Sequence, residues 1–342
     1  MPIELWVGSY AKAGGRGLYR LTCDAAGLTL GKSDDVAANA SYGAWSVRHG
    51  LHYLVEEQAA GAVSAFRTGV DGLTRQARVS SEGREPCYVA IDAAERRIAA
   101  ANYASGSIAL FELTQDGLPQ DGPAVWANAG SGPNAERQEG PHMHCVRFSP
   151  DGAFLYASDL GTDQLLRFAM DDEPMLEAAQ VAWTAPPGSG PRHLLFHPDA
   201  PLLLLVSELA STLTLFGVAT DGLTWRSTHS TLPGDFSGDS LGGDLAINAA
   251  GDRIYVTNRG HDSIAMFALD VARGTIELRQ YVPSGGASPR NLLLLDDIDR
   301  LLVVNEEAGN VVPFSIAADG MLTPAGASVS VPGAAFVFRA RA

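Results

Sequence analysis

The chain has 342 residues, 46% of them hydrophobic, and carries 39 acidic against 24 basic side chains, a formal net charge of −15. This balance excludes a nucleic-acid-binding surface, because phosphate binding needs a basic face. Three cysteines form no CxxC motif, and we find neither a secretory leader nor an apolar stretch of about 18 residues. We therefore expect a cytoplasmic protein with no membrane and no nucleic-acid partner.

A repeat runs along the whole chain. A degenerate copy, GSYAKAGGRGLYRL, lies near the N-terminus, and six further copies end in phenylalanines spaced 45, 57, 48, 51 and 47 residues apart. This period is typical of a propeller blade of four strands. In chain order the six copies are EEQAAGAVSAF (to Phe66), NYASGSIALF (to Phe111), DLGTDQLLRF (to Phe168), SELASTLTLF (to Phe216), NRGHDSIAMF (to Phe267) and NEEAGNVVPF (to Phe314).

Each repeat contains short apolar runs bounded by Gly, Pro, Asp and Ser turns, which predict strands, and none shows helical periodicity. Seven hydrophobic second strands are expected, near residues 5–10, 53–57, 98–103, 154–160, 202–208, 253–259 and 301–306. The N-terminus lacks a first strand, whereas the C-terminal AAFVFRARA supplies one. We expect that strand to join the first blade and remove its exposed edge. The prediction is an all-β, seven-bladed β-propeller of four-stranded antiparallel blades, one domain over residues 1–342.

Two registers of this repeat hold varied polar residues where a purely structural position would repeat one small or apolar residue. The first strand of a blade should start, and the second end, at the same face, so both registers should border one mouth of the channel. The start register holds Cys87, His144, Arg192, Gly243 and Arg290. The end register holds Tyr10, Glu57 or Gln58, Tyr103, Leu160, Glu208, Arg259 and Glu306, with Asn102, Asp159, Asn258 and Asn305 one residue earlier.

Three arginines at one mouth of an acidic protein favour an anion-binding pocket, although ion pairs between blades would give the same pattern. The enlarged loop GSGPNAERQEGPHMH, residues 130–144, enters this face and adds His142. Enlarged loops on one face of a repeat protein commonly belong to the binding side.

Several chemistries fit these residues poorly. His142 and His144 alternate along a strand and so should face opposite ways, and the neighbouring arginines disfavour zinc or calcium, so we expect no metal. No GxSxG motif is present, and Cys87 in PCYV shows no paired base, which indicates an inert thiol. The GSG segments lack the helix that a nucleotide site needs, so we expect no cofactor.

The remaining set suits hydrolysis of an ester or lactone on a small anionic substrate. His144 is a candidate base, Glu208 a carboxylate, and Arg192 and Arg259 can hold an anion or stabilise an oxyanion. Further side chains are expected to bind substrate: Tyr103, His142, Asp159, His193, Asn258, Arg290 and Glu306.

The chain resembles the seven-bladed propeller lactonase family, which includes propeller-type 6-phosphogluconolactonases and carboxy-cis,cis-muconate cyclases. The resemblance rests on ERQEGPHMHCVRFSPDGAFLYASDLGTDQLLRF, GSGPRHLLFHP, SELASTLTLF and VTNRGHDSIAMF, and covers nearly the whole chain. It implies metal-independent hydrolysis of a sugar lactone, most often 6-phosphogluconolactone. The family's proposed catalytic residues fall on His144, Arg192, Glu208 and Arg259.

The sequence departs from the family pattern at SEL, where Ser207 replaces the usual Asn, and in LGGDLAIN, where Asp244 is the acidic match. Three alternatives stay open: lactone-forming cyclisation of a muconate, hydrolysis of a non-phosphorylated sugar lactone, and a non-enzymatic interaction propeller. We expect a monomer or a weak homo-oligomer.

Overall fold

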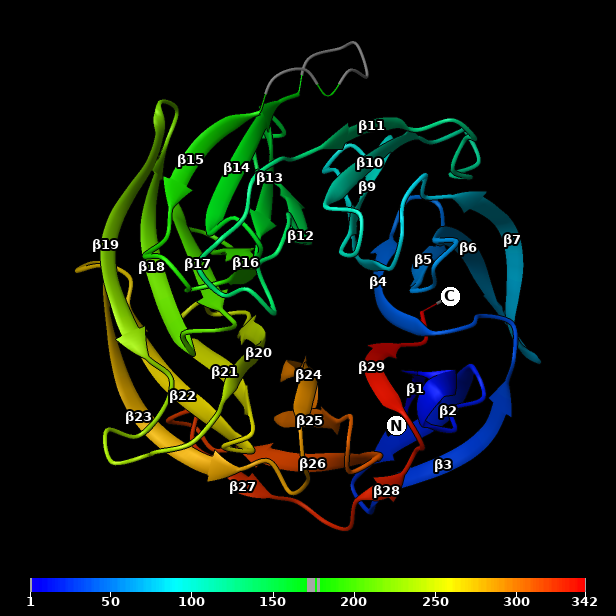
Figure 1. The fold of residues 1–342 in the computed structure, drawn as a ribbon. Coiled ribbons are helices and arrows are strands. Elements are labelled where there is room, and N and C mark those ends of the chain that lie inside the picture. Colours follow the sequence, from blue (N-terminus) through cyan, green and yellow to red (C-terminus); the bar gives the residue numbers. More distant parts are fainter. Residues whose placement is uncertain (1, 171–175, 177–178, 342) are drawn as a thin grey trace. The chain divides into compact units, whose positions relative to one another are not determined.

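The computed structural model describes residues 2–170, 176 and 179–341. Regular structure in these residues is almost entirely β, in seven antiparallel sheets with two short 3-10 turns, η1 (Ala11–Ala13) and η2 (Asp296–Ile298) (Figure 1). No helix of the described residues has the length and apolar character needed to cross a membrane.

The chain groups into two compact units. The first unit comprises Met1–Ser33 and Arg192–Arg339, and the second comprises Asp34–Pro191 and Ala340–Ala342. The expectation of one domain over the whole chain stays a prediction.

The first unit holds four sheets, apart from one end residue each of β3 and β16. In the first of these sheets the C-terminal strand pairs with the N-terminal strand, which confirms the predicted exchange (Figure 1). Its strands, in spatial order, are β29 (Ala334–Arg339), β1 (Ile3–Ser9), β2 (Leu18–Asp24) and β3 (Gly27–Asp34).

The other three sheets of the first unit follow chain order. One sheet contains β16 (Pro191–Phe196), β17 (Leu202–Ser207), β18 (Thr212–Ala219) and β19 (Gly222–Ser230). The next contains β20 (Leu241–Ile247), β21 (Arg253–Arg259), β22 (Ser263–Asp270) and β23 (Thr275–Pro283). The last contains β24 (Pro289–Leu295), β25 (Arg300–Asn305), β26 (Asn310–Ile316) and β27 (Leu322–Pro324), with β28 (Val329–Ser330) also paired to β26.

The second unit holds three sheets of the same design. They contain β4 (Ala40–Ser46), β5 (Leu51–Glu56), β6 (Ala62–Gly69) and β7 (Gly72–Ser80); β8 (Pro86–Ile91), β9 (Arg97–Asn102), β10 (Ser107–Glu112) and β11 (Ala124–Ala127); and β12 (Met143–Phe148), β13 (Phe154–Asp159), β14 (Gln164–Ala169) and β15 (Gln180–Thr184).

The repeated phenylalanines are core residues. All six are almost fully buried, at 0–1% exposure, and burial of each such side chain contributes about 1.5–3 kcal/mol. Within the first unit, one cluster joins two neighbouring sheets: Leu215 of β18 packs with Val256 of β21 and Phe267 of β22. Each sequence repeat therefore corresponds to one sheet, and the apolar side chains of that sheet pack against the next sheet.

Strand register brings the two polar registers to the same end of each sheet. The starts of the inner strands pair with the ends of the second strands, as in Pro86↔Asn102, Met143↔Asp159, Gly242↔Asn258 and Pro289↔Asn305. A β-bulge follows the start of the inner strand in each of these sheets, and bulges commonly redirect side chains beside functional sites. The predicted meeting of the two registers within a sheet is confirmed.

Candidate active site

A buried carboxylate of the first unit is shared by two guanidinium groups. Arg192 Nη1 donates to Glu208 Oε2 at 2.5 Å, and Arg259 Nη2 donates to the same oxygen at 2.8 Å. Glu208 is 1% exposed and Arg192 2%. Sequence analysis expected these three residues to act together, and the structure brings them together.

Strand ends position this cluster. Arg192 lies near the start of β16, Glu208 directly follows β17 of the same sheet, and Arg259 is the last residue of β21 in the next. Arg192 Nε also donates to the carbonyl oxygen of Gly243 at 2.8 Å. A side chain at Gly243 would clash, since its Cβ would lie 2.3 Å from Thr257 Oγ1. Glycine at this register therefore lets the backbone approach that Arg192 uses.

Arg259 is held in an unfavourable electrostatic setting. Burial lowers its pKa to about 10, repulsion from Arg192 and Arg290 acts in the same direction, and Glu208 opposes both. Its Nε is buried and has no hydrogen-bond partner among the described residues. A buried donor without an acceptor costs about 1–3 kcal/mol, and such a cost is commonly retained at functional sites.

A cavity of about 430 Å³ opens beside Arg259. Arg290 and Glu306 also line it, and Arg290 Nη1 lies 3.3 Å from Glu306 Oε2. Both residues were expected at the site and both face this cavity. The rest of its wall is polar apart from Leu241 and Gly260, and comprises Asp239, Ser240, Asp262, Ser288 and Glu307.

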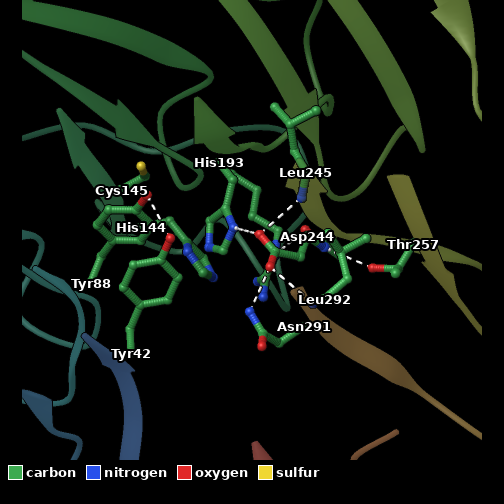
Figure 2. Close-up of polar contacts among 12 residues, drawn as sticks. Tyr42, Tyr88, His144, Cys145, His193, Asp244, Leu245, Thr257, Asn291 and Leu292 are labelled. Carbon is green, nitrogen blue, oxygen red and sulfur yellow. Dashed lines mark hydrogen bonds and ion pairs between the residues drawn. The ribbon is translucent and has the colours of Figure 1, made fainter. Parts of the chain in front are cut away.

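A second buried network of the first unit centres on Asp244 (Figure 2). Its carboxylate bonds to His193 Nδ1 at 2.8 Å, and accepts from Asn291 Nδ2 at 2.6 Å and from the backbone N–H of Leu245 and Leu292. Burial lowers the pKa of His193 to about 4, outweighing the hydrogen bond to Asp244. Burial tends to raise the pKa of Asp244, but the hydrogen bonds from His193 and the backbone hold it below its usual value. Neutral His193 therefore donates its Nδ1–H to an ionised Asp244.

In the second unit, His144 lies on β12 next to a thiol. Cys87 Sγ is 3.8 Å from His144 Nδ1 and 3.4 Å from the His144 carbonyl oxygen, and both residues are buried. The expectation that Cys87 has no base beside it is thus wrong. The two residues lie near the starts of neighbouring inner strands, β8 and β12. They are far apart in the sequence, so inspection of the residues around Cys87 could not reveal the contact. The Tyr103 ring meets the His144 ring edge-on at 5.5 Å.

His142 and Asp159 organise the enlarged loop. Asp159 Oδ1 accepts the backbone N–H of His142 at 2.7 Å and that of Gly161 at 2.9 Å. The His142 ring stacks on Tyr103 at 4.5 Å, and its Nε2 lies 3.2 Å from Glu139 Oε1. These contacts are structural, and substrate binding by His142, Asp159 and Tyr103 stays a prediction.

Asn258 is likewise used by the fold. Its Nδ2 donates to the Thr231 carbonyl at 2.8 Å and its Oδ1 accepts from the Thr231 hydroxyl at 2.6 Å. Asn258 directly precedes Arg259, and successive strand residues face opposite ways. Because of this alternation, Asn258 bonds to Thr231 whereas Arg259 lines the cavity. The same alternation, applied to the sequence, could have separated the two roles.

Comparison with known proteins identifies the family. A family model described as lactonase, 7-bladed beta-propeller, matches residues 4–338. The chain belongs to this family. Membership confirms the predicted fold class and the predicted enzyme class, a hydrolase of the lactonase type.

Named relatives span the whole chain. It is 31% identical to the 6-phosphogluconolactonase of Bacillus subtilis over 335 residues, 96% of this chain and 95% of that protein. Among solved structures, a periplasmic gluconolactonase of Pseudomonas aeruginosa superposes with a TM-score of 0.91 at 26% identity, covering 99% of each chain. A Lactobacillus plantarum protein superposes with a TM-score of 0.90 at 27% identity, again over 99% of both.

Sequence reasoning missed a cation that contacts Glu306, one of the residues that line the cavity. Lys12 Nζ lies 3.9 Å from Glu306 Oε1 and 4.9 Å from the centre of the Tyr10 ring. Lys12 lies in η1, outside both repeat registers, so no signal in the repeat pointed to it. In the part of the chain that the structure describes, no three His, Cys, Asp or Glu side chains are grouped so as to hold a metal ion.

Proposed function

We propose that this protein opens a sugar lactone by addition of water, with 6-phosphogluconolactone as the first candidate substrate and 6-phosphogluconate as its product. The supporting observation is the Arg192–Glu208–Arg259 cluster, whose outer guanidinium borders a cavity of about 430 Å³. The similarity to the Bacillus subtilis enzyme supports the phosphorylated substrate. This reaction would place the protein in the pentose phosphate pathway, and we propose a cytoplasmic location.

Arg259 is assigned to the oxyanion. Water attacks the lactone carbonyl carbon, the C=O electrons move to oxygen, and a guanidinium near that oxygen stabilises the tetrahedral intermediate. Arg259 borders the cavity, whereas Arg192 is 2% exposed and bonded to Glu208 and Gly243. Arg192 and Glu208 are therefore positioning residues that set the orientation of Arg259.

His144 is assigned to proton transfer, the role that falls to it in the family's proposed catalytic set. An imidazole can accept a proton from the attacking water at neutral pH. When the ring C–O bond breaks, the same proton passes to the ring oxygen, so the product carries one new carboxyl group and one new hydroxyl group. The thiol of Cys87 at 3.8 Å from Nδ1 supports a defined ring orientation.

A second candidate substrate is a non-phosphorylated lactone such as gluconolactone. The cavity wall favours it, because two arginines face four carboxylates: Asp239, Asp262, Glu306 and Glu307. A phosphate dianion would enter this wall against repulsion. The name of the Pseudomonas aeruginosa relative points the same way.

The test is a hydrolysis panel on purified wild type, His144→Ala and Arg259→Ala, with 6-phosphogluconolactone, gluconolactone and carboxymuconate as substrates. We expect lactone hydrolysis to fall at least 100-fold in both variants. The exposed Arg279→Ala serves as the control and should keep the wild-type rate. Near wild-type rates in both active-site variants would rule out the scheme, and turnover of carboxymuconate alone would favour the cyclase reaction.

A further inference from the structure

Two cations converge on the carboxylate of Glu306. Arg290 Nη1 lies 3.3 Å from its Oε2, and Lys12 Nζ lies 3.9 Å from its Oε1. Each carboxylate oxygen thus faces a different cation. Arg290 lies near the start of β24, Glu306 directly follows β25, and Lys12 belongs to η1. All three residues are in the first unit.

The ring of Tyr10 supports both cations. The Arg290 guanidinium lies 5.2 Å from the ring centre and Lys12 Nζ 4.9 Å, within the range of cation–π attraction. Tyr10 is buried, and its backbone N–H donates to the Gly333 carbonyl at 2.7 Å. Gly333 has φ +65°, and a Cβ there would lie 2.5 Å from the Tyr10 carbonyl oxygen. The backbone contact with Gly333 therefore holds Tyr10 in place, and Glu306 takes no part in that contact.

This arrangement opens on the cavity. Arg290 and Glu306 line it together with Arg259, and their side chains are only 15% and 18% exposed. Lys12 does not line the cavity; its side chain is 75% exposed and reaches Glu306 from outside the lining residues. An anion reaching Arg290 from the cavity must compete with Glu306, because the carboxylate already occupies the position between the cations.

We propose that Arg290 and Lys12 form the subsite for the phosphate group of a sugar lactone, and that Glu306 is its internal competitor. This inference rests on the proposed function. Phosphate carries more charge than a carboxylate and offers three acceptor oxygens, which suits a guanidinium and an ammonium together. The Glu306 side chain must leave Arg290 and Lys12 when phosphate binds. The negative charge of Glu306 therefore weakens the affinity for a phosphorylated substrate.

The direct test measures binding of 6-phosphogluconate and gluconate, which differ only by phosphate, by isothermal titration calorimetry. Glu306→Gln should tighten binding of 6-phosphogluconate about tenfold and change gluconate less than twofold, because one like charge is removed. Arg290→Met should weaken 6-phosphogluconate at least tenfold. Lys12→Met should weaken it about threefold, as expected of a more exposed cation. Thermal melts verify folding, and Arg290→Lys replaces Arg290→Met if that variant does not fold.

Glu277→Gln is the matched control. Glu277 lies 3.3 Å from Arg279 on β23, the same separation as in the Arg290–Glu306 pair, but both residues are exposed. It should leave both affinities unchanged. If the ratio of the two dissociation constants stays within twofold in the Glu306 and Arg290 variants, the subsite proposal is overturned.

The same variants separate this inference from the proposed function. Shifted binding ratios in a protein that hydrolyses no lactone would support the subsite and refute the lactonase assignment. Lactone hydrolysis in which the Glu306 and Arg290 variants leave the ratio of kcat/KM for phosphorylated and plain lactone unchanged would do the reverse.

Discussion

Replacing Glu208 by glutamine removes one negative charge from between two buried guanidinium groups while keeping the size of the side chain. In the wild type a single oxygen, Oε2, accepts from both Arg192 and Arg259 at 2.5 and 2.8 Å. In Glu208→Gln the two cations repel each other with no counter-ion between them. The Gln amide oxygen has two lone pairs and can accept from both arginines, but it carries no full negative charge to balance them.

The expected loss of stability follows from this geometry. Removing one partner of a buried ion pair costs about 3–5 kcal/mol. The amide oxygen can keep the hydrogen bonds while the charge is lost, so the lower end, about 3 kcal/mol, is expected. For a chain of this length that corresponds to a fall in Tm of about 4 °C. Because Glu208 raises the pKa of Arg259 against burial, the substitution should lower that pKa further.

We expect the substitution to lower activity even under conditions where the loss of stability leaves the protein folded. Misorienting or losing one oxyanion donor lowers rates by about 100- to 1,000-fold, so kcat/KM for the lactone should fall by at least 100-fold under conditions where the variant is fully folded. Urea unfolding and initial-rate hydrolysis measure the two effects on the same preparation. A Tm within 1 °C of wild type, with kcat/KM within threefold, would refute the reasoning.

Two companion variants isolate the cause. Glu112→Gln breaks a 2.6 Å ion pair with Arg97 that is more exposed, so we expect a cost of about 0–1 kcal/mol and unchanged activity. The double variant Arg192→Met with Glu208→Gln removes one of the two repelling cations. It should regain at least half of the lost stability without regaining activity, because Arg259 remains unsupported.

Other predictions follow from the same contacts. Cys87→Ala should keep kcat/KM within fivefold if His144 acts on water, whereas a 100-fold loss would indicate a covalent route through the thiol. EDTA should leave the hydrolysis rate unchanged, measured with and without added divalent ions; inhibition that zinc or calcium reverses would contradict this. Burial lowers the pKa of His52 to about 4, so the unfolded chain gains a proton between pH 6.5 and 4 that the folded chain refuses, and stability falls as the pH drops through that range. His52→Gln should remove about 2 kcal/mol of the difference in unfolding free energy between pH 7 and 4.5, and an unchanged difference would count against it.

Much of the fold was predictable because the determining signals are local and repeated. Turn residues and apolar runs recur with each phenylalanine, and the register at which inner and second strands meet follows from antiparallel pairing alone. The exchange of the C-terminal strand into the first sheet could also be inferred, since the N-terminal repeat lacked a first strand and the C-terminal end of the chain supplied one. The grouping of contacts into two units has no counterpart in the repeat pattern.

The site was predictable only as far as register determines it. The repeat identified Arg192, Glu208, Arg259, Arg290 and Glu306 as residues of one sheet end, but a register cannot tell which carboxylate neutralises which guanidinium. Glu208 bonds to an arginine of its own sheet and to one of the next sheet, whereas Glu306 takes one from its own sheet and a lysine from η1. Those choices depend on packing between sheets and on side-chain length.

The ion pairs around Glu208 favour binding of the transition state over binding of the substrate. Two guanidinium groups share the one carboxylate of Glu208, so the cluster keeps a positive charge that no group in it balances. A neutral lactone carbonyl gains little from that charge, whereas the oxyanion formed when water adds to it completes the balance. Interactions that strengthen only as the barrier is crossed raise kcat without tightening substrate binding. A second carboxylate bonded to Arg259 would make the ligand-free protein more stable and would remove this difference between substrate and transition state.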